Sequence, residues 1–505
     1  MMKRSLTLLA VAFCTLVATA QNVTLQRVPG PVHPYRLSVS PSAQALVVEA
    51  STDFVNWSLV SPVAASSSAT IVTDPQSTSF PRRFYRARTA VPPLPDLSQL
   101  PNTVFMAGEG FNALQCAPNG KLGFIVWRGQ DLVYRERTGT VWTEQVIGRY
   151  GRVYTPGARE EYRFQPHAAL LFDLQSRARV LWLSGSTVRH HVQQSNGTFS
   201  EAASISLAPA GSSFALFTTA IGAGDALHIA VVAAQNDGAV SYGSNKSGSW
   251  QWSRITDVVG DPRGFFKQSY APRWFSMAVD SQNAAHLTFC PQFAMPLGPE
   301  GYVKPNNELH YATDRGGAWT TQRIAWVPDE SGDAGEGASI AIGPNDQPAI
   351  AAWYNERYAT GSSQFCRLYY YTRDASGNWT QQLVTDAASG YIASDGNIGA
   401  GFAPYLRFDS RDRPNIAFCD DAAQHFPYQN EYAGNLRHAW YDGSRWMTRT
   451  VCQQTAPLDA QIVYPGMATM GNEIVFMGLD RRTVWSDYRT ATSTYTFFYV
   501  PLALP

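Results

Sequence analysis

From residue 104 onward, one pattern of short strands recurs along this 505-residue chain. Each copy has an apolar strand, a polar turn, a second apolar strand, a loop of variable length, an aromatic-rich strand, a glycine turn, and an aromatic residue that begins an alternating strand. The copies are clearest at 275–324, 339–384 and 405–451, weaker at 104–147, 166–205 and 214–255, and a last one ends near Val500. Because four short strands return in each copy, we expect an all-β propeller whose small sheets bury their faces against their neighbours.

The aromatic residues of the turns give the expected number of blades. They are Trp142, Phe199, Trp250, Trp319, Trp379 and Trp446, which follow one another at intervals of 51 to 69 residues. With the degenerate C-terminal copy, this spacing predicts seven blades, and six is the alternative.

The same turns resemble the Asp-box of sialidase-type, BNR-repeat propellers. Asp314-Arg-Gly-Gly-Ala-Trp319 contains Asp-x-Gly-x-x-Trp, although Ala312 replaces the usual Ser or Thr, and 374–379 and 245–250 are looser copies. The resemblance implies a structural turn, in which the aspartate accepts backbone N–H bonds and the Trp fills the space between blades. In that family the boxes lie on the face away from the binding site, so they support a fold and not a reaction.

The first 20 residues are typical of a removable export signal. Lys3 and Arg4 precede an apolar run from Leu6 to Val17, and Ala18-Thr-Ala20 is a small-x-small cleavage site. This predicts export to the cell surface, the periplasm or the medium. No later stretch is apolar over some 18 residues, so no membrane span is expected. Five cysteines remain after cleavage; Cys290 and Cys419 end apolar strands, where we expect buried thiols.

A second, smaller domain is predicted before the repeats. Residues 21–90 contain short alternating strands, and a Pro-rich linker over 91–103 separates them from a propeller over 104–505. The run from Glu49 to Trp57, then Thr73-Asp-Pro75 and Phe80-Pro-Arg-Arg-Phe-Tyr-Arg86, resembles a small β-sandwich module of exported proteins from Verrucomicrobia and related bacteria. The resemblance implies an accessory module without catalytic residues, in which Trp57 and Tyr85 belong to the core.

The long connections of the repeat are expected at one face of the propeller. They join the second strand to the third or one blade to the next, and these connections leave the sheets at the same end. Short loops would suffice for folding, so long ones usually carry binding sites. Within or beside them lie aromatic residues mixed with Arg, carboxylates and His, which suit a neutral or acidic sugar because rings stack on sugar faces and forked groups hold hydroxyls or carboxylates. The candidates are Arg152, Tyr154, His167, Arg263, Tyr302, Lys304, Glu356, Arg357, Tyr358, Asp395, Asp420, Asp421, His425, Tyr428, Glu431 and Tyr432.

Four other histidines sit inside strands of the repeat and are predicted to be structural: His228, His286, His310 and His438. No cofactor motif is present, so none is predicted. Calcium at Asp420-Asp421 or at 329–333 is the alternative, although neither segment has the full ligand spacing. Without the signal the chain has 37 basic and 39 acidic residues, which argues against nucleic acid or an anionic membrane as a partner.

These observations predict an exported, non-catalytic propeller that binds an extracellular glycan or glycoconjugate on its long-loop face. One alternative is an enzyme on that face, either a sialidase-like glycoside hydrolase or a polysaccharide lyase. The Arg-Ile-Pro signature of sialidases is absent, and for a lyase His167, Tyr154 and Arg152 are the first candidates. A protein-interaction scaffold is the second alternative. Nothing in the sequence specifies an oligomeric state.

Overall fold

The computed structural model describes residues 35–40, 46–52, 58–63, 66–74, 77, 82–89, 104–106, 114–128, 131–138, 141–149, 168–207, 214–233, 240–255, 269–294, 305–326, 332–357, 364–386, 397–421, 434–452, 460–471, 473–487 and 490–503. Contacts divide the chain into two compact units, Met1–Pro92 and Pro93–Pro505. The described residues contain no α-helix, and therefore no helix that is long and apolar enough to cross a membrane. The signal, the linker and the exported location stay predictions.

The N-terminal unit consists of two small antiparallel sheets around a shared apolar core. Its strands are β1 (Tyr35–Val39), β2 (Leu46–Ser51), β3 (Ser58–Val63), β4 (Thr70–Asp74) and β5 (Phe84–Thr89). β1 pairs with β4, and β2 pairs with β3 and β5. Leu37, Val39, Leu46, Val48, Val63 and Val72 form the core between the two sheets.

The motif of this unit has a structural explanation. Asp74 is buried, accepts a hydrogen bond from the Tyr85 hydroxyl at 2.8 Å and pairs with Arg83 at 3.2 Å. Arg86 pairs with the buried Glu49 at 2.7 Å. Tyr85 therefore packs on the core, as predicted, and its hydroxyl satisfies a buried carboxylate. The predicted core residue Trp57 lies outside the described residues.

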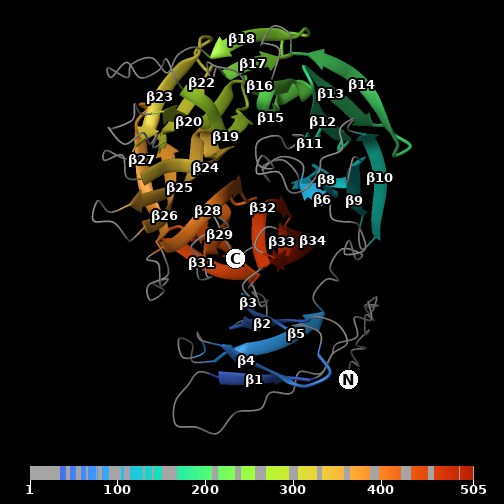
Figure 1. Cartoon of the computed structure of the whole chain (residues 1–505), viewed down its shortest axis with the longest axis vertical. Coiled ribbons are helices and arrows are strands. Elements are labelled where there is room, and N and C mark those ends of the chain that lie inside the picture. The colour runs from blue at the N-terminus through green and yellow to red at the C-terminus, as the bar shows by residue number, and fades with distance from the viewer. Residues whose placement is uncertain are drawn as a thin grey trace, which may run out of the picture. The chain divides into compact units, whose positions relative to one another are not determined.

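The second unit is a propeller of antiparallel strand groups, which Figure 1 shows arranged in a ring. Group 1 is β6 (Val104–Met106), β7 (Leu114–Cys116), β8 (Leu122–Arg128), β9 (Asp131–Thr138) and β10 (Val141–Arg149). Group 2 is β11 (Ala168–Phe172), β12 (Ala178–Ser184), β13 (Thr187–Gln193) and β14 (Phe199–Ser206). Group 3 is β15 (Phe214–Ile221), β16 (Leu227–Ala233), β17 (Val240–Ser244) and β18 (Gln251–Ile255), with the 3-10 turn η4 (Ala223–Asp225).

Group 4 is β19 (Ser269–Val279), β20 (Ala285–Ala294), β21 (Pro305–Asn307), β22 (Leu309–Thr313) and β23 (Thr320–Ala325). Group 5 is β24 (Gly332–Ile342), β25 (Pro348–Arg357), β26 (Gln364–Arg373) and β27 (Trp379–Asp386), with the 3-10 turn η6 (Pro344–Asp346). Group 6 is β28 (Asn397–Phe408), β29 (Pro414–Asp421), β30 (Gly434–Tyr441) and β31 (Trp446–Cys452). Group 7 is β32 (Ala460–Met470), β33 (Glu473–Asp487) and β34 (Thr490–Ala503).

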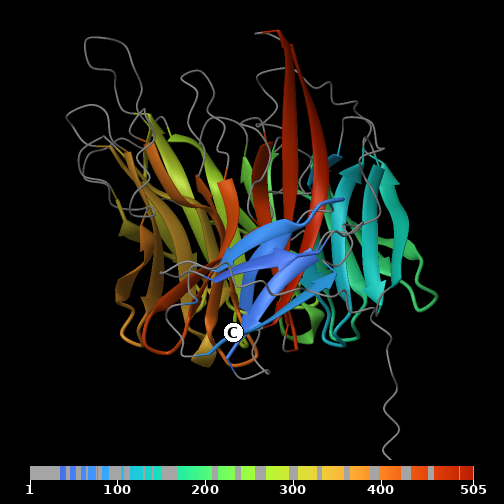
Figure 2. The ribbon, with the colours of Figure 1, turned by 90° about the horizontal axis from the view of Figure 1, so that it is seen from below.

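The innermost strands of these groups contact one another in a closed order. β7 contacts β11, followed by β15, β19, β24, β28 and β32, and β32 contacts β7. Figure 2 shows the strands of the propeller from the side, running roughly along the ring axis. This order is the one that a seven-bladed propeller requires. The blade number stays a prediction, because group 7 has three strands in the described part of the chain.

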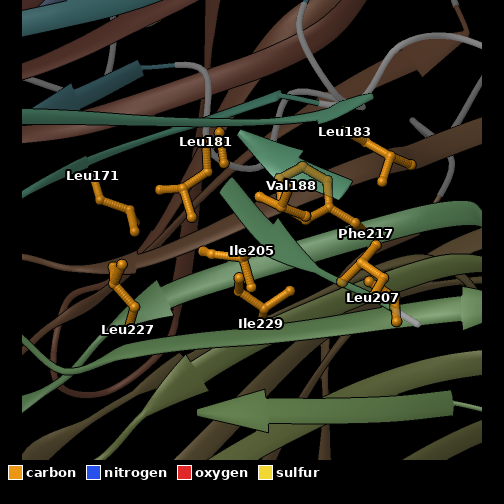
Figure 3. Packing of buried hydrophobic residues seen from close by; sticks show 11 residues of the cluster. Leu171, Leu181, Leu183, Val188, Ile205, Leu207, Phe217, Leu227 and Ile229 are labelled. Atoms are coloured by element: carbon orange, nitrogen blue, oxygen red, sulfur yellow. The ribbon is translucent and has the colours of Figure 1, made fainter. Parts of the chain in front are cut away.

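The apolar cores lie between neighbouring groups, as the repeat predicts. Leu171, Leu181 and Ile205 of group 2 pack with Phe217 and Ile229 of group 3, and Figure 3 shows these side chains gathered between the two sheets. Similar clusters join groups 3 and 4, groups 4 and 5, and groups 5 and 6. Among the cysteines, Cys290 and Cys419 are buried and form no disulfide, which confirms their predicted role in packing.

The turn aromatics also join neighbouring groups. The ring of Trp379, in group 5, packs edge-on against Tyr311 of group 4, with centroids 5.0 Å apart, and its Nε1 donates to Gln322 Oε1 at 3.1 Å. Trp319 and Trp446 make the same edge-on contact with a tyrosine of the preceding group, and their Nε1 atoms donate to Ser253 and Gln382 of that group. The turn tryptophans therefore fill the space between blades, as expected from the Asp-box resemblance. Whether the turns are Asp-boxes stays a prediction.

The turn aspartates differ in what they bind. Asp374 accepts from the Asn378 backbone N–H of its own turn at 2.8 Å, as expected. Asp314 instead accepts from the Ala285 N–H at 2.6 Å and pairs with Lys246 of group 3 at 2.8 Å. This aspartate therefore links its turn to the neighbouring strand β20 and to the preceding blade, which the motif alone does not predict.

Replacing Trp379 by alanine is expected to lower the free energy of unfolding by about 2–4 kcal/mol, since the ring contact and the bond to Gln322 are both lost. Urea unfolding measures this change. The matched control is Leu383→Ala in the same strand, where the side chain is 47% exposed and the expected change is within about 0.5 kcal/mol. Equal effects of the two substitutions would mean that the aromatic does not join the blades.

Candidate functional site

The two ends of the propeller differ in their connections. In groups 2, 3, 5 and 6, antiparallel pairing places the first-to-second and third-to-fourth strand turns at one end, and these turns are short. The second-to-third connections and the links between groups lie at the other end, which we call the long-loop face. Long connections there, such as 150–167, 256–268, 387–396 and 422–433, are outside the described residues.

Several loops predicted for this face are shorter than expected, because the strands extend into them. β24 begins at Gly332, β25 continues to Arg357, β26 begins at Gln364 and β28 begins at Asn397. The apolar residues of each strand do not extend as far as these positions. The apolar pattern therefore marks the part of a strand whose side chains pack in a core, and it misses the ends that pair only through the backbone.

Four of the sixteen candidate residues lie at described strand ends. Glu356 and Arg357 end β25, and Asp420 and Asp421 end β29. The other candidates lie outside the described residues and stay predictions: Arg152, Tyr154, His167, Arg263, Tyr302, Lys304, Tyr358, Asp395, His425, Tyr428, Glu431 and Tyr432.

Two parallel pairings connect the ends of groups 4, 5 and 6 at the long-loop face. Asn307 of β21 is opposite Asp333 of β24, and Gln364 of β26 is opposite Asn397 of β28. β25, β26, β28 and β29 therefore lie side by side at this end, although they belong to two groups. With about 4.8 Å between strands, the ends of β25 and β29 are roughly 15 Å apart.

This continuous sheet end carries mostly polar residues, and we call it the polar edge: Asn355, Glu356, Arg357, Gln364, Asn397, Asp420 and Asp421. Sequence analysis found Glu356, Arg357, Asp420 and Asp421, and missed Asn355, Gln364 and Asn397. The available signal was a change from apolar to amide residues at the end of each strand. Which strands lie side by side across the polar edge cannot be predicted from the sequence of a single repeat.

A second polar group at the long-loop face has described side chains. Glu308 Oε2 is 3.0 Å from His310 Nε2, and its Oε1 is 3.2 Å from Arg323. The Arg323 guanidinium lies 4.7 Å from the centre of the Trp326 ring, which is 41% exposed. His310 is buried and stacks on Phe289, with centroids 5.6 Å apart. β23 and the residue that follows it thus present Arg323 and Trp326 to solvent beside the buried Glu308–His310 pair.

The remaining strand histidines are structural, in agreement with their interpretation from the repeat. His228 and His286 occupy equivalent positions in β16 and β20, and each ring Nδ1 lies 2.6 Å from a tyrosine hydroxyl, Tyr242 or Tyr311. His286 Nε2 is 3.2 Å from the buried Asp280. Burial lowers the pKa of His228 to about 4, with Lys246 acting in the same direction, and burial also lowers the pKa of His286. Neither ring is accessible to a substrate, since both are 0% exposed.

His310 and His438 lie in third strands, β22 and β30, and do not share the second-strand position of His228 and His286. His438 takes the place of the strand tyrosine, and Asn415 takes the place of the strand histidine. His438 Nε2 lies 2.9 Å from Asn415 Oδ1, and Arg449 Nε donates to His438 Nδ1 at 3.0 Å. Burial, with Arg449 nearby, holds the pKa of His438 well below its usual range. A polar pair is therefore kept between these strands, formed by Asn415 and His438 in place of a His and a Tyr.

No cluster of three or more His, Cys, Asp or Glu suited to a metal ion occurs among the described residues. The polar edge combines amides, carboxylates and an arginine, which together can donate to and accept from hydroxyl groups. Calcium at Asp420-Asp421 stays a prediction, because the side chains needed to complete a site are not described.

Comparison with known proteins shows the fold. No protein-family model matches the chain, and no curated protein sequence matches it. The solved structure of an ulvan lyase from a new polysaccharide lyase family is similar over 79% of this chain and 93% of its own, with 8% identity and a TM-score of 0.53. The polysaccharide lyase Uly1 matches 81% of this chain and 96% of its own at 9% identity and a TM-score of 0.49. The Aleuria aurantia lectin bound to α-methyl-L-fucoside matches 68% of this chain and 97% of its own, at 14% identity and a TM-score of 0.36. At such identities the similarity to the ulvan lyase supports a propeller fold and does not carry an activity.

Proposed function

We propose that this protein is exported and binds an extracellular glycan on its long-loop face without catalysis. The observation that carries the proposal is the polar edge, where amide, carboxylate and arginine residues lie at the ends of four neighbouring strands from two blades. Sugar hydroxyls both donate and accept hydrogen bonds, so a row of mixed donors and acceptors is the surface that they require.

The position of the edge supports the same function. It lies at the end of the propeller from which the long connections leave, and long connections on a rigid scaffold are the usual place for binding residues. The exposed Trp326 beside Arg323, at the same face of group 4, adds an aromatic surface of the kind on which sugar rings stack.

A polysaccharide lyase is the alternative, and the ulvan lyase shares the fold. Such an enzyme needs a base, such as a His or a Tyr, in reach of its substrate. The described His–Tyr pairs, His228 with Tyr242 and His286 with Tyr311, are buried and cannot take that role. The candidates for a lyase site are therefore Arg152, Tyr154 and His167.

Removing two charges of the polar edge is expected to weaken binding by about 10–100-fold, because the two carboxylates that accept from sugar hydroxyls together contribute about 1.4–2.8 kcal/mol. The variants are Glu356→Gln and Asp420→Asn, alone and together, in the full secreted chain. A glycan array selects the ligand, and calorimetry measures the affinity. The control is Glu201→Gln in the outer strand β14, where the ion pair with Arg189 is exposed and should not affect binding.

Product release from each positive glycan, followed in parallel, separates the alternatives. Binding without new chain ends supports the proposal. New reducing ends would instead identify a hydrolase, and unsaturated ends a lyase. Absence of binding to any glycan would refute the proposal and leave the interaction scaffold.

A further inference from the structure

The last two strands extend beyond the sheet to which they belong. The first residue of β32, Ala460, is opposite Arg482 of β33, so the rest of β33 continues past the end of its inner neighbour. Over that length β33 pairs with β34 alone among the described strands. Figure 2 shows this red hairpin rising past the ends of the other strands. We call residues 481–487 and 490–495 the C-terminal arm.

The arm projects from the long-loop face. β32 begins at the end where β31 finishes, and the connection between these strands is one of the links between groups. The five residues from Thr483 to Asp487 extend roughly 16 Å beyond the start of β32, at about 3.3 Å per residue. The arm therefore stands at the end of the propeller from which the long connections leave.

Strand register places three residues with binding chemistry on one face of the arm. Arg481 is directly opposite Tyr495, and Trp485 lies four residues further along the same strand, opposite Ala491. Positions two and four apart share a face of a strand, so Arg481, Tyr495 and Trp485 lie on one face and Arg482 and Val484 on the other.

The repeat does not explain this Trp. The turn tryptophans begin fourth strands at the opposite end of the propeller, where they join neighbouring blades. Trp485 is in the second strand of group 7, in a part of it that pairs with β34 alone among the described strands. A two-stranded ribbon has no apolar core of its own to need such a residue.

Charge separates the two faces of the arm. From Leu479 to Trp485 and from Ala491 to Phe497, Arg481 is the only charged residue at the positions that share its face. Asp480 and Arg482 lie together on the other face, where their charges cancel. Within the arm, the first face thus combines one guanidinium with two aromatic residues, and Leu479 and Phe497 continue the same face next to it. A guanidinium binds a carboxylate or sulfate through two parallel bonds, and aromatic rings stack on sugars.

We propose that the C-terminal arm binds acidic polysaccharide, with a carboxylate or sulfate at Arg481 and sugar rings at Tyr495 and Trp485. This inference rests on the proposed function and names its ligand class. Arg481 and Trp485 are about 13 Å apart along the strand, a distance that an oligosaccharide spans and a single sugar does not. A polymer is therefore favoured over its monomers.

The test compares two neighbouring arginines, Arg481 and Arg482, that lie on opposite faces of the arm. Binding of the full secreted chain is measured to polygalacturonate, which carries carboxylates, to carrageenan, which carries sulfates, and to neutral arabinan and galactan. Arg481→Gln and Trp485→Ala are each expected to weaken binding of an acidic polymer about 10-fold. The control variants Arg482→Gln and Val484→Ala should stay within about twofold, since they lie on the other face. The responses to polygalacturonate and carrageenan distinguish carboxylate from sulfate.

Equal losses in Arg481→Gln and Arg482→Gln would show general attraction of polyanions and overturn the inference. If Arg481→Gln and Arg482→Gln both kept the wild-type binding of acidic polymers, the inference would also be overturned. Binding of neutral polymers alone would overturn it as well. The proposed function would survive either of these results. Binding of none of the polymers, with a negative glycan array, would refute both proposals. Thermal unfolding checks each variant, and Arg481→Lys, which keeps the charge and removes the planar fork, should bind at an intermediate level in a fold that melts as the wild type does.

Discussion

Asp280→Ala is expected to lower the free energy of unfolding by about 3–5 kcal/mol, among the largest effects of any single change in the propeller. The Asp280 carboxylate is buried and accepts from the Gln282 and Ala284 backbone N–H groups at 3.0 and 2.8 Å. It also lies 3.2 Å from His286 Nε2. Alanine leaves these groups without their acceptor inside the sheet, where water does not replace it.

Urea unfolding of Asp280→Ala measures this loss. The free energy of unfolding of Asp280→Asn should lie between those of Asp280→Ala and the wild type, because one acceptor oxygen remains. The control is Asp442→Ala. Asp442 also accepts two backbone N–H groups, from Ser444 and Arg445, at 2.8 and 2.9 Å, but in an exposed turn. There the expected loss is about 1 kcal/mol. If the two losses were equal, burial of Asp280 would not be the reason for its importance.

Acid is expected to destabilise the propeller well above the pH at which carboxylates titrate. Burial lowers the pKa of His228 and of His190 to about 4, with Lys246 and Arg179 adding to the effect. In the unfolded chain each ring returns to a pKa of about 6.5. Between these values the unfolded state binds more protons than the folded state, so stability is complete above about pH 6.5 and falls as the pH decreases toward 4. Each ring contributes a loss of about 3 kcal/mol at pH 4.

The measurement is the free energy of unfolding in urea from pH 7.5 to pH 4. The double variant His190→Asn, His228→Asn should be less stable at pH 7.5, yet its curve should lose about 6 kcal/mol less over the same interval. Curves of equal slope for variant and wild type would show that other groups cause the acid transition.

The repeat predicted the propeller well because each strand's apolar residues pack against a neighbouring copy. Leu171, Phe217 and Ile229 follow that pattern, and so does the Trp379 contact with Tyr311. The same pattern led to loops that were too long, since residues such as Asn397 and Gln364 pair through their backbones and carry no apolar signal.

The candidate site was predictable only in part. Glu356 and Asp420 were found because they follow apolar strands at the elaborated face. Their presence along one edge depends on the pairing of β26 with β28, and a repeat that describes each copy alone contains no information about pairing between copies. The C-terminal arm was missed for a similar reason: Arg481 and Trp485 become one surface only when the register of β33 and β34 is known.

The closed order of inner strands has a consequence for how the ring assembles. Every other neighbouring pair of inner strands comes from groups consecutive in the chain, whereas β7 and β32 come from opposite ends of the propeller. Among the described strands, no backbone pairing joins groups 1 and 7 at this seam. Contacts between distant segments form late, because the intervening chain must first be ordered. The seam is therefore the expected last step of folding, and the place where tension on the two ends of the propeller would first open it.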